Sequence, residues 1–336
     1  MTTALTETLA GPVLVLLDHA PDGTLRAAVR ELVTIARDLG AVEGVWVDDA
    51  GTGAPVGPGT VVLHELGELG LGVVVAVDLA GADPRLTGVV GDALAAVAAG
   101  RHAAAVLVTS SFENKEIAAT IGVRAGAGVV VDASGVVVQE GRLVVDKTVL
   151  AGTWTTRCAV TTPLAVVAVK ANAAQPTPAE VATSPEVEVL AVPSGPAAVT
   201  VVEQTPRPAS ARPALGEAQV VVVGGRGTQG DFSAVEELAD VLGGAVGATR
   251  VATDEGWIDH EAQIGQTGVT VAPRLYIGAG VSGAVHHRGG MQSSGTIVAV
   301  NSDPESPIFE IADLGIVGDL FSVLPQASAE LRRLRG

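Results

Sequence analysis

Short aliphatic runs alternate with amphipathic helical patterns along most of the chain, and this alternation restricts the fold more than any other feature. The segment PVLVLL at 12–17 is continuously apolar, as expected for a buried strand, and residues 24–40 then carry apolar side chains at helical spacing. We expect Thr24 to cap this helix and Gly40 to end it. Strands and helices in alternation form a mostly parallel sheet with helices on its faces.

Both halves of the chain show this pattern, which predicts an α/β fold with two Rossmann-like domains, each a mostly parallel sheet with flanking helices. Residues 135–145 add a hairpin with its turn at Glu140–Gly141, and 218–244 form a strand, a glycine turn and a helix from about Asp231. Other strands are expected at 41–47, 60–63, 72–77, 104–108, 128–132, 245–248, 273–277 and 296–300, and other helices near 84–99, 113–125, 281–290 and 320–334.

A proline-rich stretch divides the two halves, with prolines at 176, 178, 185, 193, 196, 206, 208 and 213. Valine-rich pieces at 187–192 and 198–202 lie inside this stretch and are expected to be the closing strands of the first domain. We therefore predict an N-terminal domain over 1–203, a hinge over 204–214 and a second domain over 215–336.

The composition excludes several classes of protein. Aromatic residues make up only 2% of the 336 residues, so the cores must consist of Val, Ala, Leu and Ile. The net charge of −17 argues against binding nucleic acid or an anionic membrane surface. The single cysteine, Cys158, excludes an intrachain disulfide, and its apolar neighbours predict a buried thiol. Since no apolar run approaches the ~20 residues of a membrane span and the start lacks a targeting pattern, we expect a soluble, cytoplasmic protein.

The segment VVVVGGRG at 220–227 has the order of a nucleotide-binding turn, with a strand, glycines and then a helix. Glycines let backbone amides approach a pyrophosphate, but this is neither a Walker A loop nor a complete dinucleotide fingerprint, so a plain tight turn stays open. The cations of this half are scarce. Between 216 and 331 there is no lysine, and the arginines are Arg226, Arg250, Arg274 and Arg288. Their position beside glycine-rich segments favours an anionic ligand over scattered solvated arginines.

Two further polar segments are candidates for ligand contacts. QIGQTG at 263–268 offers amide and hydroxyl groups that can address the heteroatoms of a planar ring, although a surface turn is an equal alternative. His286 and His287 are adjacent, so on a regular helix or strand they point in different directions and cannot share one metal ion. No carboxylate lies nearby at ligand spacing, which argues further against a zinc site.

These motifs, in this order, make the second half resemble the α subunit of electron-transfer flavoproteins. The resemblance runs from about 218 to 335, and its most specific part is LYIGAGVSGAVHHRGGMQSSGTIVAVN at 275–301. The segments GGRG, GATR, QIGQTG and NSDPESPIFEIADLGIVGDLF support it. The first half fits only loosely, through its α/β pattern and LAGTWTTRC at 150–158.

The resemblance implies that the second domain binds FAD and that the N-terminal domain carries no cofactor and contacts a partner. Arg226 would face the pyrophosphate or stack near the ring, Arg250 would lie close to the isoalloxazine, and His287 would stabilise charge at its pyrimidine end. The full set of implied FAD-binding residues is Arg226, Thr249, Arg250, Ile264, Gly265, Gln266, Thr267, Ser282, Gly283, Ala284, Val285, His286, His287, Asn301, Asp319 and Leu320.

The family also implies a role without substrate chemistry on this chain. As one subunit of a heterodimer with a β subunit, it would carry electrons from flavin dehydrogenases of the acyl-CoA type, in fatty acid β-oxidation, to a membrane-bound quinone oxidoreductase. The β subunit would hold AMP, or a second FAD in a bifurcating version. His286 stands where the family usually has glutamine, and Thr249 where it has serine. A different class, an NAD-binding or other dinucleotide-binding enzyme or regulatory module, is the alternative.

Overall fold

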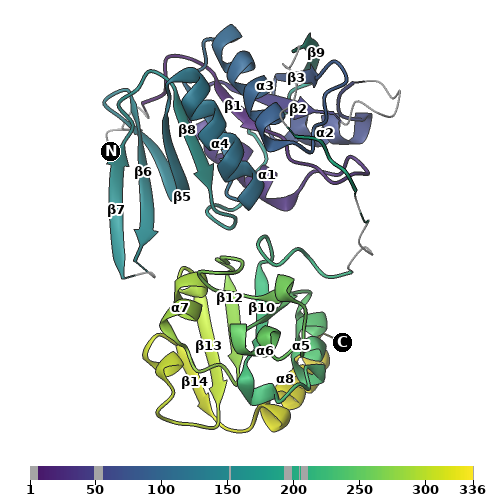
Figure 1. Cartoon of the computed structure of the whole chain (residues 1–336), viewed down its shortest axis with the longest axis vertical. Helices are drawn as coiled ribbons and strands as arrows, with labels where there is room; N and C mark the ends of the chain where they lie inside the picture. Colours follow the sequence, from purple (N-terminus) through teal and green to yellow (C-terminus); the bar gives the residue numbers. More distant parts are fainter. Residues whose placement is uncertain are drawn as a thin grey trace. The chain divides into compact units, whose positions relative to one another are not determined.

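The computed structural model describes residues 7–48, 56–150, 153–192, 199–203, 205 and 211–335. The chain divides into two compact units (Figure 1), one comprising 1–147 and 156–206 and the other 148–155 and 207–336. Each unit is built on its own sheet with flanking helices, as the alternating pattern predicts. The expected hinge at 204–214 includes position 204 and positions 206–210, which lie outside the described residues, so it stays a prediction.

The first unit contains a mixed sheet in which nine strands are described, in the order β7-β6-β5-β8-β4-β1-β2-β3-β9. Strand β1 (Val13–Leu16) is central and runs parallel to both of its neighbours. The other elements are β2 (Val42–Val47), β3 (Val73–Asp78), β4 (Ala105–Thr109), β5 (Gly128–Gln139), β6 (Arg142–Val149), β7 (Trp154–Ala159), β8 (Ala165–Val169) and β9 (Glu186–Ala191), with helices α1 (Ala27–Leu39), α2 (Thr60–Glu68), α3 (Thr87–Gly100) and α4 (Phe112–Ala125).

Successive side chains of β1 point to opposite faces of this sheet, so the strand contributes apolar residues to the core on each face. Val13 and Val15 belong to the core cluster that includes α1 and Leu66 of α2. Leu14 and Leu16 belong to the cluster on the opposite face, which includes α3 and α4. Because helices cover both faces, the central strand is apolar at every position.

Two expected features of the first unit are confirmed. Gln139 pairs with Arg142 in the antiparallel hairpin, and the intervening Glu140 and Gly141 have φ of 51° and 70°. Positive φ at both central positions is the geometry of a two-residue hairpin turn. Helix α1 ends at the expected Gly40, whose N–H donates to the carbonyl of Ala36.

Strands β7 and β8 were not individually expected, and four expectations about the first unit are wrong. Residues 60–63 are the first turn of α2 rather than a strand, because the helix buries Leu66 against the sheet. Thr24 does not cap α1, since it lies in a turn where its N–H donates to Asp22 and its carbonyl accepts from Ala20. Residues 199–202 form no strand, and residue 198 lies outside the described part. Cys158 is exposed, because β7 is the last strand of the sheet and is exposed along most of its length.

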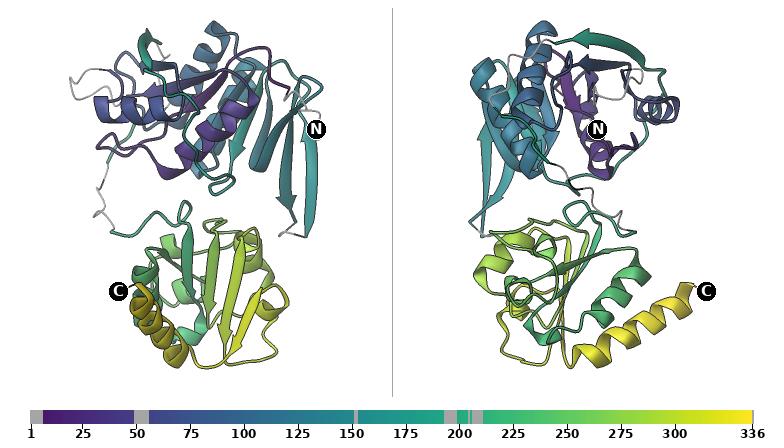
Figure 2. Two further views of the ribbon diagram at one scale, coloured as in Figure 1. Left: turned by 180° about the vertical axis from the view of Figure 1, so that it is seen from behind. Right: turned by 45° about the vertical axis from the view of Figure 1, so that its right-hand side comes forward.

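The second unit is a parallel sheet in which five strands are described, in the order β11-β10-β12-β13-β14 (Figure 2). The strands are β10 (Val220–Gly224), β11 (Ala245–Ala248), β12 (Leu275–Ala279), β13 (Thr296–Asn301) and β14 (Leu314–Val317), and the helices are α5 (Ser233–Leu242), α6 (Arg250–Asp254), α7 (Val285–Met291) and α8 (Leu320–Arg335). Strand β14 and helix α6 were not expected, because each is a single short segment of four or five residues.

The strand order of the second unit places a topological switch point at β10. The chain passes from β10 to β11 on one side and then returns to β12 on the other. Helices α5 and α8 cover one face through Leu238 and Leu324, while Tyr276 and Met291 belong to the core on the other face. The carboxyl ends of β10 and β12 diverge at such a point, and open parallel sheets bind ligands there.

The exposure of Cys158 leads to a direct prediction. A thiol reagent should label Cys158 in the native chain without denaturant, because β7 leaves this position exposed. The measurement is colorimetric thiol titration, with Cys158→Ser as the control that removes the chain's one cysteine. Labelling that requires denaturant would contradict the exposed position.

Candidate functional site

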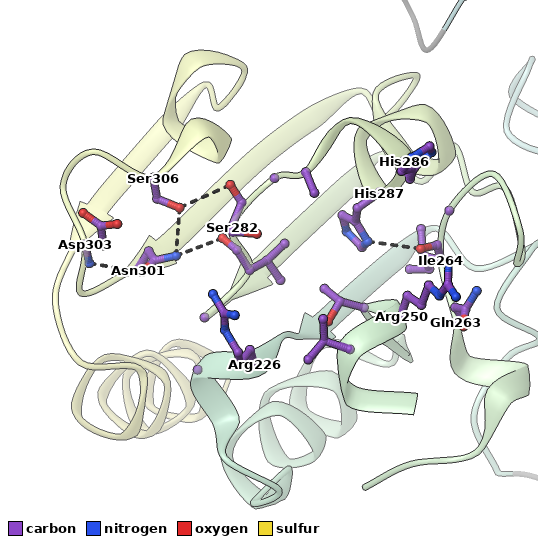
Figure 3. Close-up of a pocket in the computed structure, with 18 of the residues that line it drawn as sticks. Arg226, Arg250, Gln263, Ile264, Ser282, His286, His287, Asn301, Asp303 and Ser306 are labelled. Atoms are coloured by element: carbon purple, nitrogen blue, oxygen red, sulfur yellow. Dashed lines mark hydrogen bonds between the residues drawn. The ribbon is translucent and has the colours of Figure 1, made fainter. Parts of the chain in front are cut away.

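The second unit contains a cavity of about 580 Å³ at the carboxyl ends of its central strands (Figure 3). Its walls come from the turns after β10, β12 and β13, from the start of α6 and α7, and from the loop at 263–268. This volume is within the usual range for small-molecule and cofactor sites. The expected anionic-ligand site is therefore a real concavity at the switch point of the sheet.

Two glycine turns meet at the base of the cavity. The N–H of Gly225 donates to Ala279, and the N–H of Gly227 donates to Gly280. A Cβ on Gly227 would lie 2.6 Å from the Cα of Gly280, and Gly280 itself has φ of +63°. Only glycine allows this approach of one backbone to another. Arg226 lies between Gly225 and Gly227 in the sequence, and this contact places it on the wall of the cavity.

The QIGQTG loop is fastened to α7 by its backbone. The N–H of Gln266 donates to the carbonyl of His286 at 3.1 Å. A Cβ on Gly290 would lie 2.4 Å from the nitrogen of Gly265, so the loop rests directly on the helix backbone. Inside the loop, the buried Gln263 donates from Nε2 to the hydroxyl of Thr267 at 3.0 Å. These contacts turn Gln266 and Thr267 toward the cavity, which both line.

The two adjacent histidines occupy opposite environments. His287 is 6% exposed, and burial lowers its pKa from 6.5 to about 4. Its Nδ1 lies 3.1 Å from the carbonyl oxygen of Ile264, and its Nε2 lies 2.7 Å from the hydroxyl of Tyr276. His286 is exposed, with Nδ1 2.9 Å from Oε1 of Gln266. Both residues line the cavity, but their rings have different hydrogen-bond partners, in agreement with the prediction that they do not share one metal ion.

The expected role of His287 as a charge stabiliser stays a prediction, and the structure shows its contacts within the protein. Because the carbonyl of Ile264 can only accept, Nδ1 must carry the proton, and Nε2 then accepts from Tyr276. Both nitrogens are therefore used within the protein, and the lowered pKa keeps the ring neutral. His287 still lines the cavity, but with no free N–H to offer a ligand.

The four arginines between 216 and 331 separate into two groups. Arg226 and Arg250 line the cavity, and Figure 3 shows Arg226 directed toward the segment of Ser282. Arg250 also pairs with Asp254 at 3.1 Å. Arg288 instead pairs with Glu310 at 3.0 Å, and Arg274 precedes β12, at the opposite end of that strand from the cavity. Two of the four therefore border the cavity.

Most of the residues that the resemblance implies line this one cavity, and three do not. Val285 is 58% exposed, and Leu320 is part of the core. Asp319 accepts from the N–H of Phe321 and from the hydroxyl of Ser322 at the start of α8. The cavity also includes residues that were not expected: Gly227, Gln229, Val251, Gln263, Gly280, Val281, Asp303 and Ser306.

Several of the unexpected residues belong to segments that the sequence analysis had already singled out. Gly227 and Gln263 belong to the GGRG and QIGQTG segments, and Ser306 follows Asn301 in the run NSDPESP. In the structure, Asn301 donates from Nδ2 to the carbonyl of Val281 at 2.9 Å and to Ser306 at 3.1 Å. Asn301 therefore holds the turn after β12 against the turn after β13.

Thr249 provides a test of whether the cavity suits a polar ligand. Its hydroxyl oxygen is buried, and among the described residues it has no hydrogen-bond partner. A buried hydroxyl without a partner is costly, so such groups are usually satisfied. Thr249 also lines the cavity, and rotation about its Cα–Cβ bond would turn the hydroxyl toward a bound group. The chain thus offers a hydroxyl, two arginines and two glycine turns to one ligand, which fits a nucleotide cofactor.

Fold and site together define an α/β protein that binds a nucleotide cofactor at a switch point. Residues 13–195 match the family model described as electron transfer flavoprotein domain, and 214–292 match the electron transfer flavoprotein FAD-binding domain. The electron transfer flavoprotein subunit alpha of Mycobacterium leprae (strain TN) is 42% identical over 325 residues, 96% of this chain and 99% of the relative. The chain therefore belongs to the electron transfer flavoprotein family.

Two other relatives carry the same subunit name at different levels of similarity. The subunit alpha of Bacillus subtilis (strain 168) is 33% identical over 333 residues, 96% of this chain and 98% of the relative. The mitochondrial subunit alpha of Dictyostelium discoideum is 53% identical over 126 residues, 37% of this chain and 36% of the relative. The second unit is thus the FAD-binding domain of a family of electron carriers. None of the helices described here is both long and apolar enough to cross a membrane.

The hydroxyl of Thr249 can be tested by isosteric replacement. In Thr249→Val, the unfolding temperature of the FAD-free protein should stay the same or rise, because a buried hydroxyl without a partner is removed. FAD binding should weaken by roughly tenfold, since a hydrogen bond to the ligand is lost. Calorimetry and fluorescence titration measure the two effects. Thr249→Ser keeps the hydroxyl and should retain FAD affinity, whereas equal binding by the Val and Ser variants would contradict this use of the hydroxyl.

Proposed function

We propose that the chain is the FAD-carrying α subunit of a heterodimeric electron carrier, with FAD bound in the cavity of the second unit. The observation that carries this proposal is the cavity itself, at the switch point, bordered by Arg226, Arg250 and the hydroxyl of Thr249. The bound flavin would supply the redox chemistry, by accepting and releasing electrons one at a time. The chain would bind the cofactor, orient it and set its electrostatic environment.

The residues around the cavity suit different parts of FAD. Arg226 suits the pyrophosphate, because it places a positive charge on the cavity wall beside the two close-packed glycine turns. Arg250, Gln266 and Thr267 suit the isoalloxazine ring. Asn301 positions the turns at the remaining end of the cavity, which suits the adenosine part. Arg250 is a cation at the cavity and would stabilise negative charge gained by the ring.

The proposed partners are those that the resemblance to the family implies. The relatives named subunit alpha support a heterodimer in which this chain pairs with a β subunit. We propose that the β subunit holds AMP, or a second FAD in a bifurcating version. Flavin dehydrogenases of the acyl-CoA type would donate electrons in fatty acid β-oxidation, and a quinone oxidoreductase would accept them. The carrier would act in the cytoplasm, with no substrate chemistry on this chain.

The proposal is tested by co-expressing the chain with its β subunit. The purified complex should be yellow and release one FAD per heterodimer on denaturation, or two if the β subunit also holds FAD, as measured by chromatography of the released nucleotide. An acyl-CoA dehydrogenase with its substrate should reduce the bound flavin, and a quinone oxidoreductase should reoxidise it. A colourless complex that binds NAD instead would favour a dinucleotide-binding module and overturn the proposal.

The role of Arg250 can be tested with a matched arginine. Arg250→Ala should lower the first reduction potential of the flavin, because a cation at the cavity favours the reduced, more negative ring. The reduced flavin should lose on the order of 1 kcal/mol of electrostatic stabilisation, since the side chain of Arg250 is largely exposed and screened. Spectroelectrochemical titration measures it. Arg288→Ala removes the same charge from outside the cavity lining and should change the potential less; equal shifts would contradict the role of Arg250.

A further inference from the structure

His286 lies in the first turn of helix α7, where the cavity of the second unit meets solvent. The residue is exposed, and it lines the cavity together with the loop at 263–268 (Figure 3). Histidine is the side chain that ordinarily changes its charge between about pH 5 and 8. An exposed imidazole in the lining of a cavity therefore offers the bound ligand a charge that depends on pH.

Two hydrogen bonds join His286 to Gln266. The N–H of Gln266 donates to the carbonyl oxygen of His286 at 3.1 Å. In return, Nδ1 of His286 lies 2.9 Å from Oε1 of Gln266, and because an amide oxygen only accepts, Nδ1 must carry a proton. Each of the two residues thus contributes one donor and one acceptor. The ring of His286 is therefore held beside the cavity, although it is exposed.

The contact with Gln266 is compatible with both charge states of the ring. In the neutral ring with a proton on Nδ1, the other nitrogen, Nε2, is bare, and the charged ring has gained a proton from solvent there. The bond from Nδ1 to Gln266 is present in both states. Protonation thus adds one positive charge to the cavity wall without breaking the contact that positions the ring.

Few other ionisable groups surround His286. The 263–268 loop, which packs against it, contains no ionisable residue. On α7 itself, Arg288 pairs with Glu310 at 3.0 Å. The ionisable residues that line the cavity with His286 are Arg226, Arg250, His287 and Asp303. Because histidine is the residue type in this set that ordinarily titrates near neutral pH, the response of the cavity to pH depends on its histidines.

We propose that His286 couples the reduction potential of the bound flavin to pH, by adding a positive charge to the cavity wall when it is protonated and by holding Gln266 in both charge states. This inference deepens the proposed function and rests on it, because it assigns the cavity to FAD. A positive charge beside the ring stabilises the negative charge that the ring gains with an electron. The flavin should therefore become easier to reduce as the pH falls.

The exposure of His286 limits the size of this effect. Water and dissolved salt screen a charge at an exposed position, where interactions between charges contribute only modestly. We expect protonation of His286 to raise the ratio of reduced to oxidised flavin, at a fixed applied potential, by roughly twofold to fivefold. The increase should become smaller at high salt, because the charge is then screened more strongly.

The first experiment measures the reduction potential against pH. The FAD-loaded complex with the β subunit is titrated spectroelectrochemically between about pH 5 and 8, as the wild type and as His286→Gln, which keeps an amide donor but cannot be charged. As the pH falls, the first reduction potential of the wild type should become more positive relative to that of the variant. Proton uptake by the flavin itself is common to both proteins and cancels in this comparison. Parallel curves overturn the proposal.

His260→Gln is the matched control for the charge. His260 is exposed in the same unit but does not belong to the cavity lining. This variant should show the same dependence on pH as the wild type. If it shifts the curve as much as His286→Gln does, the effect comes from the overall charge of the unit and the role of His286 is overturned.

The second experiment tests the contact with Gln266. In the same complex, labelled with ¹⁵N-histidine, two-bond ¹H–¹⁵N correlation should show His286 with a protonated Nδ1 and a charge that changes between about pH 5 and 8. The variant His286→Gln assigns the signals. A ring that keeps one charge state over this range, or a neutral ring protonated only at Nε2, overturns the proposal. His286→Ala, which removes the donor, should bind FAD more weakly than His286→Gln, and equal affinities overturn the positioning of Gln266.

These outcomes separate the inference from the proposed function. A complex that binds FAD and accepts electrons, but whose potential does not depend on His286, overturns the inference and leaves the proposed function in place. A complex that binds no FAD overturns the proposed function itself. A potential that responds to pH through His286, in a complex that binds FAD, supports both.

Discussion

The site depends on one contact, the approach of the turn after β10 to the turn after β12. Gly227 and Gly280 lie so close that a Cβ on the former would be 2.6 Å from the Cα of the latter. The two strands are neighbours in register, yet the chain leaves them in different directions, so their turns form the floor of a cavity. Side chains at these positions would separate the turns and fill the space that a nucleotide needs.

Above this floor, the cavity is completed by a loop that has little regular structure of its own. The QIGQTG loop relies on α7, through the backbone of His286 and the ring of His287, and on the close contact of Gly265 with Gly290. Buried polar chains of this kind are stable only when every member has a partner. The donor that completes this chain is the hydroxyl of Tyr276. The loop that carries Gln266 and Thr267 is thus connected by hydrogen bonds to the core of the sheet.

The sequence predicted most elements because their patterns are local. Helix α1 and strand β1 have unambiguous apolar periodicity, and the turn at Glu140–Gly141 is marked by a glycine, which readily adopts positive φ. The failures have tertiary causes. The run at 60–63 is short and apolar, which does not separate strand from helix, and burial of Leu66 decided in favour of α2. Cys158 is exposed although its neighbours are apolar, because β7 is the last strand of its sheet.

The sequence by itself determined the family, the two α/β units and most of the residues around the cavity, because glycine turns and a few polar residues form recognisable local motifs. Only the tertiary structure decided what each residue does there. His286 and His287 are the same residue type in adjacent positions, yet one is exposed beside Gln266 and the other is buried between Tyr276 and Ile264. Burial and hydrogen-bond partners come from strands and loops distant in sequence, so the resemblance distinguished the two positions but the local pattern did not give the environment of either ring.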